Sequence, residues 1–305
     1  MTPLIFSVGD SAPIARRIAE EMSIEVGRLF SKSFPDGETY LRFDTSVDGR
    51  DVFLVCSLDR PDHKYLPLVF AAATARELGA ERVVLIAPYL AYMRQDNRFQ
   101  PGEAVSSTYF AQSLSAWFDG LVTVDPHLHR YHDLGEIYEI PNRVLHAADT
   151  IAAWISSHVP GALIVGPDSE SEQWVRAVAQ TAGVPFTVLK KVRHGDRDVE
   201  VSVPNVEEWE NRIPILVDDI ISTARTMIET AGHLQQAGLP PPVCIGVHAI
   251  FADDAFLALH EAGARHIITC DTIRHPTNEI ALAPLLAAGC QELLTELSSK
   301  ADTNK

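Results

Sequence analysis

Asp218 and Asp219 form an acidic pair directly after an apolar run at residues 215–217, which predicts a buried strand of a parallel sheet. Ligands of open α/β sheets bind beyond the carboxyl ends of the strands. Two carboxylates at such an end can accept hydrogen bonds from ribose hydroxyls or bind a magnesium ion. The pair therefore marks a candidate site for a sugar or a metal.

Two hydroxyl residues, Ser222 and Thr223, follow the acidic pair, and a helix is expected to begin at about Ala224, with Thr223 as its N-cap. A helix N-terminus with free N–H groups attracts anions. With the carboxylates, this arrangement predicts a pocket for a phosphorylated sugar. The alternative from these residues alone is an ordinary strand–turn–helix with an acidic turn.

A second set of chemically active residues follows the predicted strand at 82–87. This segment is aromatic and rich in arginine, and it contains Tyr89, Tyr92, Arg94, Gln95, Asp96 and Arg98. Arginine can stack on a base and can also bind a phosphate through two hydrogen bonds. The segment suits a nucleotide, although a solvated loop is the alternative.

Histidines are concentrated after the predicted strand at 121–124, at His127, His129 and His132. They lack the full set of nitrogen and sulfur ligands of a structural zinc site. Magnesium bound mainly by oxygen, with one imidazole helping, fits the segment better. Surface histidines without a ligand are the alternative.

Two further segments carry turn or charge signals. The sequence FPDGETY at 34–40 contains Pro-Asp-Gly, which favours a turn, and a plain hairpin is as consistent as a functional one. Residues 190–197 read KKVRHGDR, a basic stretch in an acidic protein, and either a solvated hairpin tip or a functional segment fits it.

Composition limits the class of protein. The chain has 305 residues, 46% of them hydrophobic, and a formal charge of −16 from 41 acidic and 25 basic side chains. This charge argues against non-specific binding of nucleic acid or of an anionic membrane. The four scattered cysteines are expected to be buried thiols in a reducing compartment. No membrane span or signal peptide is evident, so we expect a cytoplasmic protein.

Strands and helices are expected to alternate along the chain, and the pattern restarts after Pro141. We expect an α/β fold of two tandem domains, residues 1–145 and 146–305, each a mostly parallel sheet flanked by helices. The last helix, at about 281–297, could pack back on the first domain. The candidate segments of both halves follow strands, so a cleft between the domains would collect them.

Taken in order, the motifs resemble the ribose-phosphate diphosphokinase, or phosphoribosyl-pyrophosphate synthetase, family over residues 34–271. The resemblance rests on FPDGE, YMRQDNR, the histidine after the fourth predicted strand, PDSE, KKVR and VDDIIST. It implies two phosphoribosyltransferase-like domains, the first on the ATP side and the second on the ribose 5-phosphate side. It also implies transfer of the β,γ-diphosphoryl group of ATP to the 1-hydroxyl of the sugar, with AMP released.

The resemblance also assigns residues to roles. ATP-binding residues would be Phe34, Asp36, Glu38, Arg94, Gln95, Asp96 and Arg98. The first three would reach the ATP of a neighbouring subunit, which implies a homo-oligomer, a dimer or larger. Magnesium would be the cofactor, held by His127 and Asp168, and Lys191 and Arg193 would be catalytic. Ribose 5-phosphate would be held by Asp218, Asp219, Ser222, Thr223, Ala224, Arg225 and Thr226.

One departure from the family pattern lies in the sugar-phosphate loop, where Ala224 and Arg225 replace two glycines. A Cβ at position 224 restricts access to positive φ and limits how closely N–H groups approach a phosphate. The basic segment resembles archaeal-type members more than the commonest bacterial ones. Two alternatives stay open: a type I phosphoribosyltransferase, and a non-catalytic subunit that regulates a synthetase.

Overall fold

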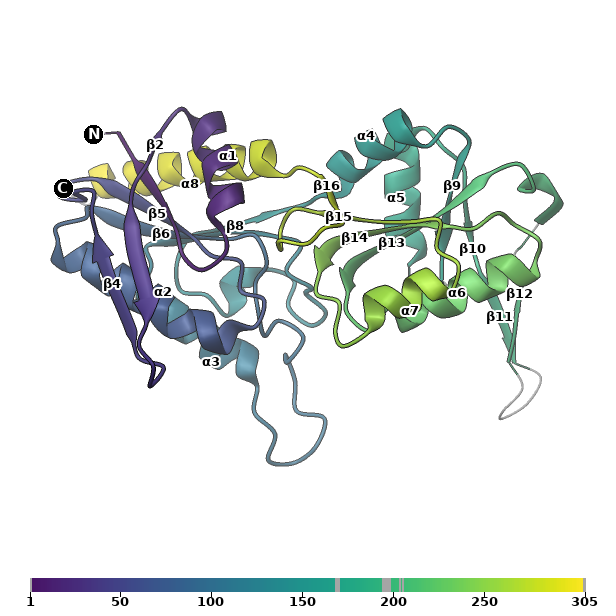
Figure 1. Ribbon diagram of the computed structural model, residues 1–305, viewed down its shortest axis with the longest axis horizontal. Coiled ribbons are helices and arrows are strands. Elements are labelled where there is room, and N and C mark those ends of the chain that lie inside the picture. The colour runs from purple at the N-terminus through teal and green to yellow at the C-terminus, as the bar shows by residue number, and fades with distance from the viewer. Residues whose placement is uncertain (1, 168–170, 194–198, 203, 205, 304–305) are drawn as a thin grey trace. The chain divides into compact units, whose positions relative to one another are not determined.

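The computed structural model describes residues 2–167, 171–193, 199–202, 204 and 206–303. The chain forms two compact units (Figure 1). The N-terminal unit comprises residues 1–146, 272–274 and 282–305, and the C-terminal unit comprises residues 147–271 and 275–281. None of the helices in the described part of the chain is both long and apolar enough to cross a membrane.

The N-terminal unit is built on a six-stranded parallel sheet in the order β2-β1-β5-β6-β7-β8. Its strands are β1 (Leu4–Ser7), β2 (Glu25–Val26), β5 (Asp51–Val55), β6 (Arg82–Ala87), β7 (Gly120–Val124) and β8 (Asn142–Leu145). An antiparallel hairpin of β3 (Leu29–Ser33) and β4 (Thr39–Phe43) forms a separate sheet. The helices are α1 (Ala12–Met22), α2 (Pro61–Glu77), α3 (Ser106–Ser115), the short 3-10 helix Leu134–Glu136 and α8 (Ala283–Thr303).

The C-terminal unit repeats this plan with the order β10-β9-β13-β14-β15-β16, again parallel throughout. Its strands are β9 (Ala162–Gly166), β10 (Phe186–Val188), β13 (Ile213–Ile221), β14 (Val243–Ala249), β15 (His266–Cys270) and β16 (Asn278–Ile280). Its hairpin pairs β11 (Lys190–Arg193) with β12 (Val199–Ser202). The helices are α4 (Ala148–His158), α5 (Glu172–Ala182), α6 (Arg225–Gln236), α7 (Ala255–Glu261) and the 3-10 helix Val206–Glu208.

The two units therefore share one element order. In each, the first two strands of the sheet are followed by an antiparallel hairpin and then by the remaining four strands. This confirms the predicted α/β class and the two similar, mostly parallel sheets. One predicted boundary was wrong, because the strand expected at 215–217 continues as β13 through the acidic pair to Ile221.

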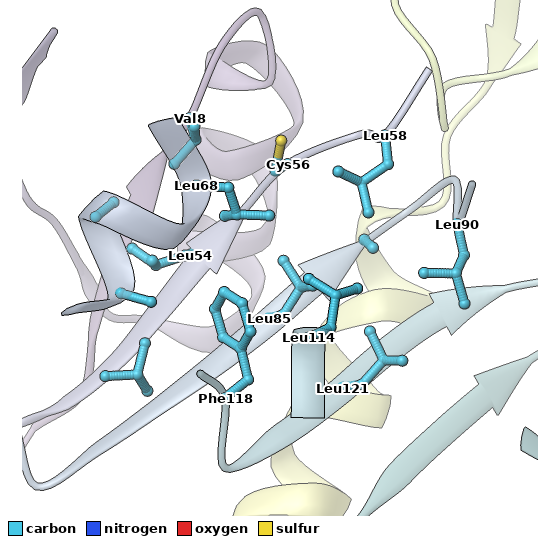
Figure 2. Packing of buried hydrophobic residues seen from close by; sticks show 14 of the residues in the cluster. Val8, Leu54, Cys56, Leu58, Leu68, Leu85, Leu90, Leu114, Phe118 and Leu121 are labelled. Atoms are coloured by element: carbon cyan, nitrogen blue, oxygen red, sulfur yellow. The ribbon is translucent and has the colours of Figure 1, made fainter. Parts of the chain in front are cut away.

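One core lies between the first sheet and helices α2 and α3. Alternate strand residues face this layer, including Leu54 of β5 and Leu85 of β6, and they pack with Leu68 of α2 and Leu114 of α3 (Figure 2). All four side chains are at most 1% exposed. The strands are apolar on both faces, as expected for a sheet covered by helices on both sides.

The last helix completes the opposite face of the first sheet. Helix α8 contacts α1, β7 and β8, and Leu286 and Leu293 are fully buried (Figure 1). The approach is close, because a Cβ added at Gly120 of β7 would lie 2.9 Å from Cδ2 of Leu293. In the C-terminal unit, α4 contacts α5 and β16, the corresponding helix and strand. Helix α8 therefore packs on the first sheet in the position that α4 occupies on the second sheet.

Removing the side chain of Leu293 should destabilise the N-terminal unit. We expect Leu293→Ala to lower the free energy of unfolding by about 2–5 kcal/mol, because a buried leucine leaves a cavity that closes only in part. The matched control is Leu66→Ala in the same unit, where the side chain is 53% exposed, with an expected change within about 0.5 kcal/mol. Urea unfolding of the full chain measures both, and equal effects would contradict the docking of α8.

Candidate functional site

The acidic pair, Asp218 and Asp219, lies in the C-terminal half of strand β13, just before the loop. Asp218 pairs with Gly246 of β14, and its Oδ1 accepts a hydrogen bond of 2.9 Å from the backbone N–H of Asp219. Both aspartates are half-buried, as is Ser222, which follows the strand. The structure thus places two carboxylates and a hydroxyl at the carboxyl end of a central strand, as the sequence predicted.

The start of helix α6 differs from the prediction. The helix begins at Arg225, and its N-cap is Ala224, so the expectation that Thr223 caps the helix was wrong. No side chain caps this N-terminus. The N–H groups of the first helical turn therefore face the loop without a side-chain acceptor, which favours an anion there.

Ala224 adopts the conformation that we expected its Cβ to disfavour. Its φ is 56° and its ψ is 10°, in the left-handed region. An L-residue with a Cβ is less stable there than glycine by about 1–2 kcal/mol. The fold therefore keeps the backbone geometry of a glycine at this position, and strain of this kind is concentrated at functional sites. Arg225 and Thr226 are exposed beside it.

The arginine-rich segment forms a loop after β6. Arg94 and Gln95 are exposed, whereas Nε of Arg98 donates a 2.8 Å hydrogen bond to the carbonyl of Glu103. The Glu103 carboxylate in turn accepts hydrogen bonds from the backbone N–H groups of residues 99 and 100. These hydrogen bonds join residues 98–100 to Glu103 and so close this part of the loop on itself.

Asp96 is the buried member of this segment. Its side chain is 6% exposed, Oδ1 lies 3.8 Å from Nε of Arg130, and Oδ2 has no hydrogen-bond partner among the described residues. A buried carboxylate oxygen without a partner is unfavourable. The ion pair links the loop after β6 to the histidine segment after β7.

Tyr92 precedes these residues and lines a cavity of about 490 Å³ in the N-terminal unit. Its φ is 65°, and its hydroxyl donates a 2.5 Å hydrogen bond to Asp62 of α2. The hydrogen bond to this carboxylate raises the pKa of Tyr92. Tyr65 and Phe110 add aromatic walls to the cavity.

His127 follows β7 in a strained turn. Asp125 has a φ of 36° and His127 a φ of 47°, and the N–H of His127 donates to the carbonyl of Asp125. Asp125 Oδ1 also lies 2.8 Å from Nδ1 of His146, and this hydrogen bond raises the pKa of His146. Nε2 of His127 is 2.8 Å from Nε2 of His129.

The predicted metal ligands are only half described. Asp168 lies outside the described residues, so its place beside His127 stays a prediction. Within the described part of the chain, no group of three or more histidine, cysteine, aspartate or glutamate residues could hold a metal ion.

The two hairpins carry the remaining predicted residues. Phe34, Asp36 and Glu38 are exposed at the β3–β4 turn, where Gly37 has a φ of 92° and Asp36 Oδ1 accepts a hydrogen bond from the N–H of Glu38. Lys191 and Arg193 lie in β11, paired with Val201 and Val199 of β12. Both segments thus belong to antiparallel strand pairs, β3 with β4 and β11 with β12.

Within the N-terminal unit, the residues predicted to bind ATP fall into two groups. The tip of the β3–β4 hairpin lies apart from the loop that precedes α3 and contains Arg94 and Arg98 (Figure 1). The second loop instead approaches the histidine segment through Asp96 and Arg130.

Sequence reasoning missed one group at the carboxyl ends of β1 and β5. Lys64 Nζ, in a side chain only 14% exposed, bonds to Asp59 Oδ1 at 2.6 Å, Asp10 Oδ1 at 2.9 Å and the Ser57 carbonyl at 2.9 Å. These residues are separated by up to 54 positions and form no local motif. The hydrogen bond between Tyr92 and Asp62 escaped notice for the same reason.

Comparison with known proteins accounts for both units. Residues 3–117 match the N-terminal domain of ribose phosphate pyrophosphokinase, and residues 133–286 match the phosphoribosyl transferase domain. The ribose-phosphate pyrophosphokinase of Methanopyrus kandleri is 33% identical over 295 residues, which cover 95% of this chain and 99% of that protein. The Methanothermobacter thermautotrophicus protein of the same name is 33% identical over 286 residues, covering 93% and 98%.

A solved structure agrees with these matches. The crystal structure of phosphoribosylpyrophosphate synthetase from Mycobacterium smegmatis has a TM-score of 0.82 and 25% identity, covering 97% of this chain and 100% of that one. The likeness spans both units rather than one transferase domain. The chain therefore belongs to the ribose-phosphate pyrophosphokinase family, whose members make 5-phosphoribosyl 1-pyrophosphate from ATP and ribose 5-phosphate.

Proposed function

We propose that the chain makes this compound by moving the β,γ-diphosphoryl group of ATP as one piece to the 1-hydroxyl of ribose 5-phosphate, with release of AMP. The observation that carries the proposal is the end of β13, where Asp218 and Asp219 precede a helix N-terminus that no side chain caps. This places carboxylates that can bind sugar hydroxyls next to backbone N–H groups that can bind a phosphate.

The sugar phosphate is assigned to this loop. Asp218 and Asp219 would accept hydrogen bonds from the 2- and 3-hydroxyls, and residues 222–226 would hold the 5-phosphate. Ala224 supports the assignment because its left-handed backbone is the one that a glycine would take in a phosphate loop. Arg225 is exposed at the first position of the helix and adds a cation to the same anion site.

ATP is assigned to the edge formed by the loops after β6 and β7. Arg94, Gln95, Asp96 and Arg98 would line its site, with His127 and Asp168 holding Mg²⁺, which the family generally uses. Magnesium supplies charge neutralisation for the phosphate oxygens. The half-buried His127 fits a cation that keeps oxygen ligands from substrate and water.

Lys191 and Arg193 are proposed to stabilise the transition state. Negative charge moves toward the oxygen that bridges the diphosphoryl group and AMP, so cations placed there favour the transition state over the bound substrate. Phosphoryl transfer depends on positioning and charge neutralisation more than on covalent help. The hairpin β11–β12, which carries both residues, holds the same place in its unit as β3–β4 does in the other.

A complete ATP site is proposed to need two copies of the chain. Phe34, Asp36 and Glu38 are exposed on the β3–β4 hairpin, whose tip lies apart from the loop before α3 (Figure 1). A neighbouring subunit could receive this hairpin, which makes a dimer the smallest active unit. All four cysteines are buried and none forms a disulfide, consistent with an enzyme of the reducing cytoplasm.

The reaction is tested by incubating the purified protein with ATP, ribose 5-phosphate and Mg²⁺. Formation of AMP and 5-phosphoribosyl 1-pyrophosphate in equal amounts is the expected result. A type I phosphoribosyltransferase would consume 5-phosphoribosyl 1-pyrophosphate instead of making it. A regulatory subunit would form neither product. Production of ADP in place of AMP would contradict transfer of the diphosphoryl group.

In the same assay, Lys191→Ala and Arg193→Ala should each lower kcat by about 10² to 10⁴, the scale on which loss of one preorganised charge-stabilising donor acts. The KM for ATP should change far less, because the cations act mainly in the transition state. Lys190→Ala removes a cation from the neighbouring position of the same strand and serves as the control, with kcat near that of the wild type. A sharp rise in KM with unchanged kcat would make the segment a binding element only.

The sugar-phosphate loop is tested at its two unusual positions. Ala224→Gly should lower the KM for ribose 5-phosphate or leave it unchanged, and it should stabilise the fold by up to about 1 kcal/mol by relieving the left-handed alanine. Arg225→Gly should raise this KM clearly if the guanidinium binds the phosphate. Arg225→Ala separates loss of charge from added chain flexibility. If no variant changes KM, the loop does not bind the phosphate as proposed.

Composite sites should appear in mixing experiments. Glu38→Ala and Lys191→Ala proteins, each nearly inactive alone, should regain part of the activity after mixing and subunit exchange, because a mixed dimer retains one intact site. Two preparations of Lys191→Ala protein, mixed in the same way, are the control. A fully active monomer, measured by sedimentation at the assay concentration, would rule out the shared site.

A further inference from the structure

His129 is not among the residues assigned so far, yet its imidazole lies against that of His127. The two Nε2 atoms are 2.8 Å apart, the ring centroids are 4.3 Å apart, and the angle between the ring planes is 83°. His127 is half-buried and His129 is exposed. The pair therefore opens to solvent at one side.

The geometry of the pair matches two ligands of one metal ion. Two nitrogens bound at right angles in an octahedral site, each about 2.1 Å from the metal, are about 3.0 Å apart. A straight hydrogen bond of 2.8 Å between the rings would instead place the centroids about 5 Å apart. The observed 4.3 Å is shorter, so the rings are inclined to each other with both Nε2 atoms on the near side.

The backbone holds this arrangement in place. Asp125 and His127 both have positive φ, and the hydrogen bond of Asp125 to His146 fixes the start of the turn. Arg130, next to His129, is tied to the buried Asp96. Strained backbone of this kind persists where the surrounding structure enforces it, often at ligand sites.

We propose that His129 is a second protein ligand of the cation at His127, so that the chain offers two imidazoles to one metal ion. The inference rests on the proposed metal role of His127. Imidazole suits Co²⁺, Ni²⁺ and Zn²⁺ better than Mg²⁺, which prefers oxygen. The two-histidine site therefore binds these metals better than Mg²⁺ before substrate arrives, and its remaining positions are open to water or phosphate oxygens.

Binding of Co²⁺ alone to the substrate-free full chain tests the proposal, by calorimetry and by the visible absorption of the bound ion. His129→Ala and His127→Ala should each weaken Co²⁺ binding about ten-fold or more, since even outer-shell changes weaken metal sites 10–100-fold. His132→Ala, an exposed histidine three positions further on, is the matched control and should bind as the wild type does. Unfolding midpoints should be the same for all variants.

The outcomes separate this inference from the proposed function. Equal Co²⁺ affinity in the wild type and His129→Ala overturns the inference, whether or not His127→Ala weakens binding. Loss in His132→Ala as large as that in His129→Ala also overturns it, because binding would then be a general property of the histidine-rich surface. AMP formation is measured separately with Mg²⁺; its absence would overturn the proposed function, while Co²⁺ binding that needs both His127 and His129 would still support the two-histidine site.

Discussion

Burial of both faces of two parallel sheets determines where this chain can carry polar chemistry. Strands β6, β7 and β9 are almost wholly buried, so their side chains serve packing. Carboxylates, histidines and arginines can meet substrate only where the strands end. The loops after β6, β7 and β13 occupy that edge of their sheets. Arg94, Arg98, His127 and Ser222 lie on these loops, and Asp218 and Asp219 lie near the end of β13 itself.

Backbone strain is concentrated at the same edges. Among the described residues, every non-glycine position with positive φ except Ser23 follows a strand of one of the two sheets: Arg60, Tyr92, Asp125, His127, Ala224, Phe251 and Asp253. Each conformation costs about 1–3 kcal/mol and persists because packed strands and helices enforce it. Ala224 shows this directly, since its loop keeps a left-handed geometry without the glycine that would make it easy.

Local pattern was enough to predict the fold class, most strands and the turn that carries Phe34. Apolar runs and Pro-Asp-Gly act over a few residues, and the structure agrees with them. Prediction failed where the local conformation or contact depends on residues far apart in the sequence. The left-handed Ala224 is imposed by its surroundings, the carboxylates around Lys64 come from separate loops, and the contact between His127 and His129 depends on a strained turn that no motif announces.

The central claim is that the two sheets divide the substrates, with ribose 5-phosphate at the end of β13 and ATP at the ends of β6 and β7. Hydrogen–deuterium exchange of the full chain with one substrate at a time tests it most directly. Ribose 5-phosphate alone should slow exchange at residues 222–227 and leave residues 94–98 unchanged, whereas a non-hydrolysable ATP analogue with Mg²⁺ should slow exchange at 94–98 and 125–129. Protection of 94–98 by the sugar phosphate, with none at 222–227, would contradict the account.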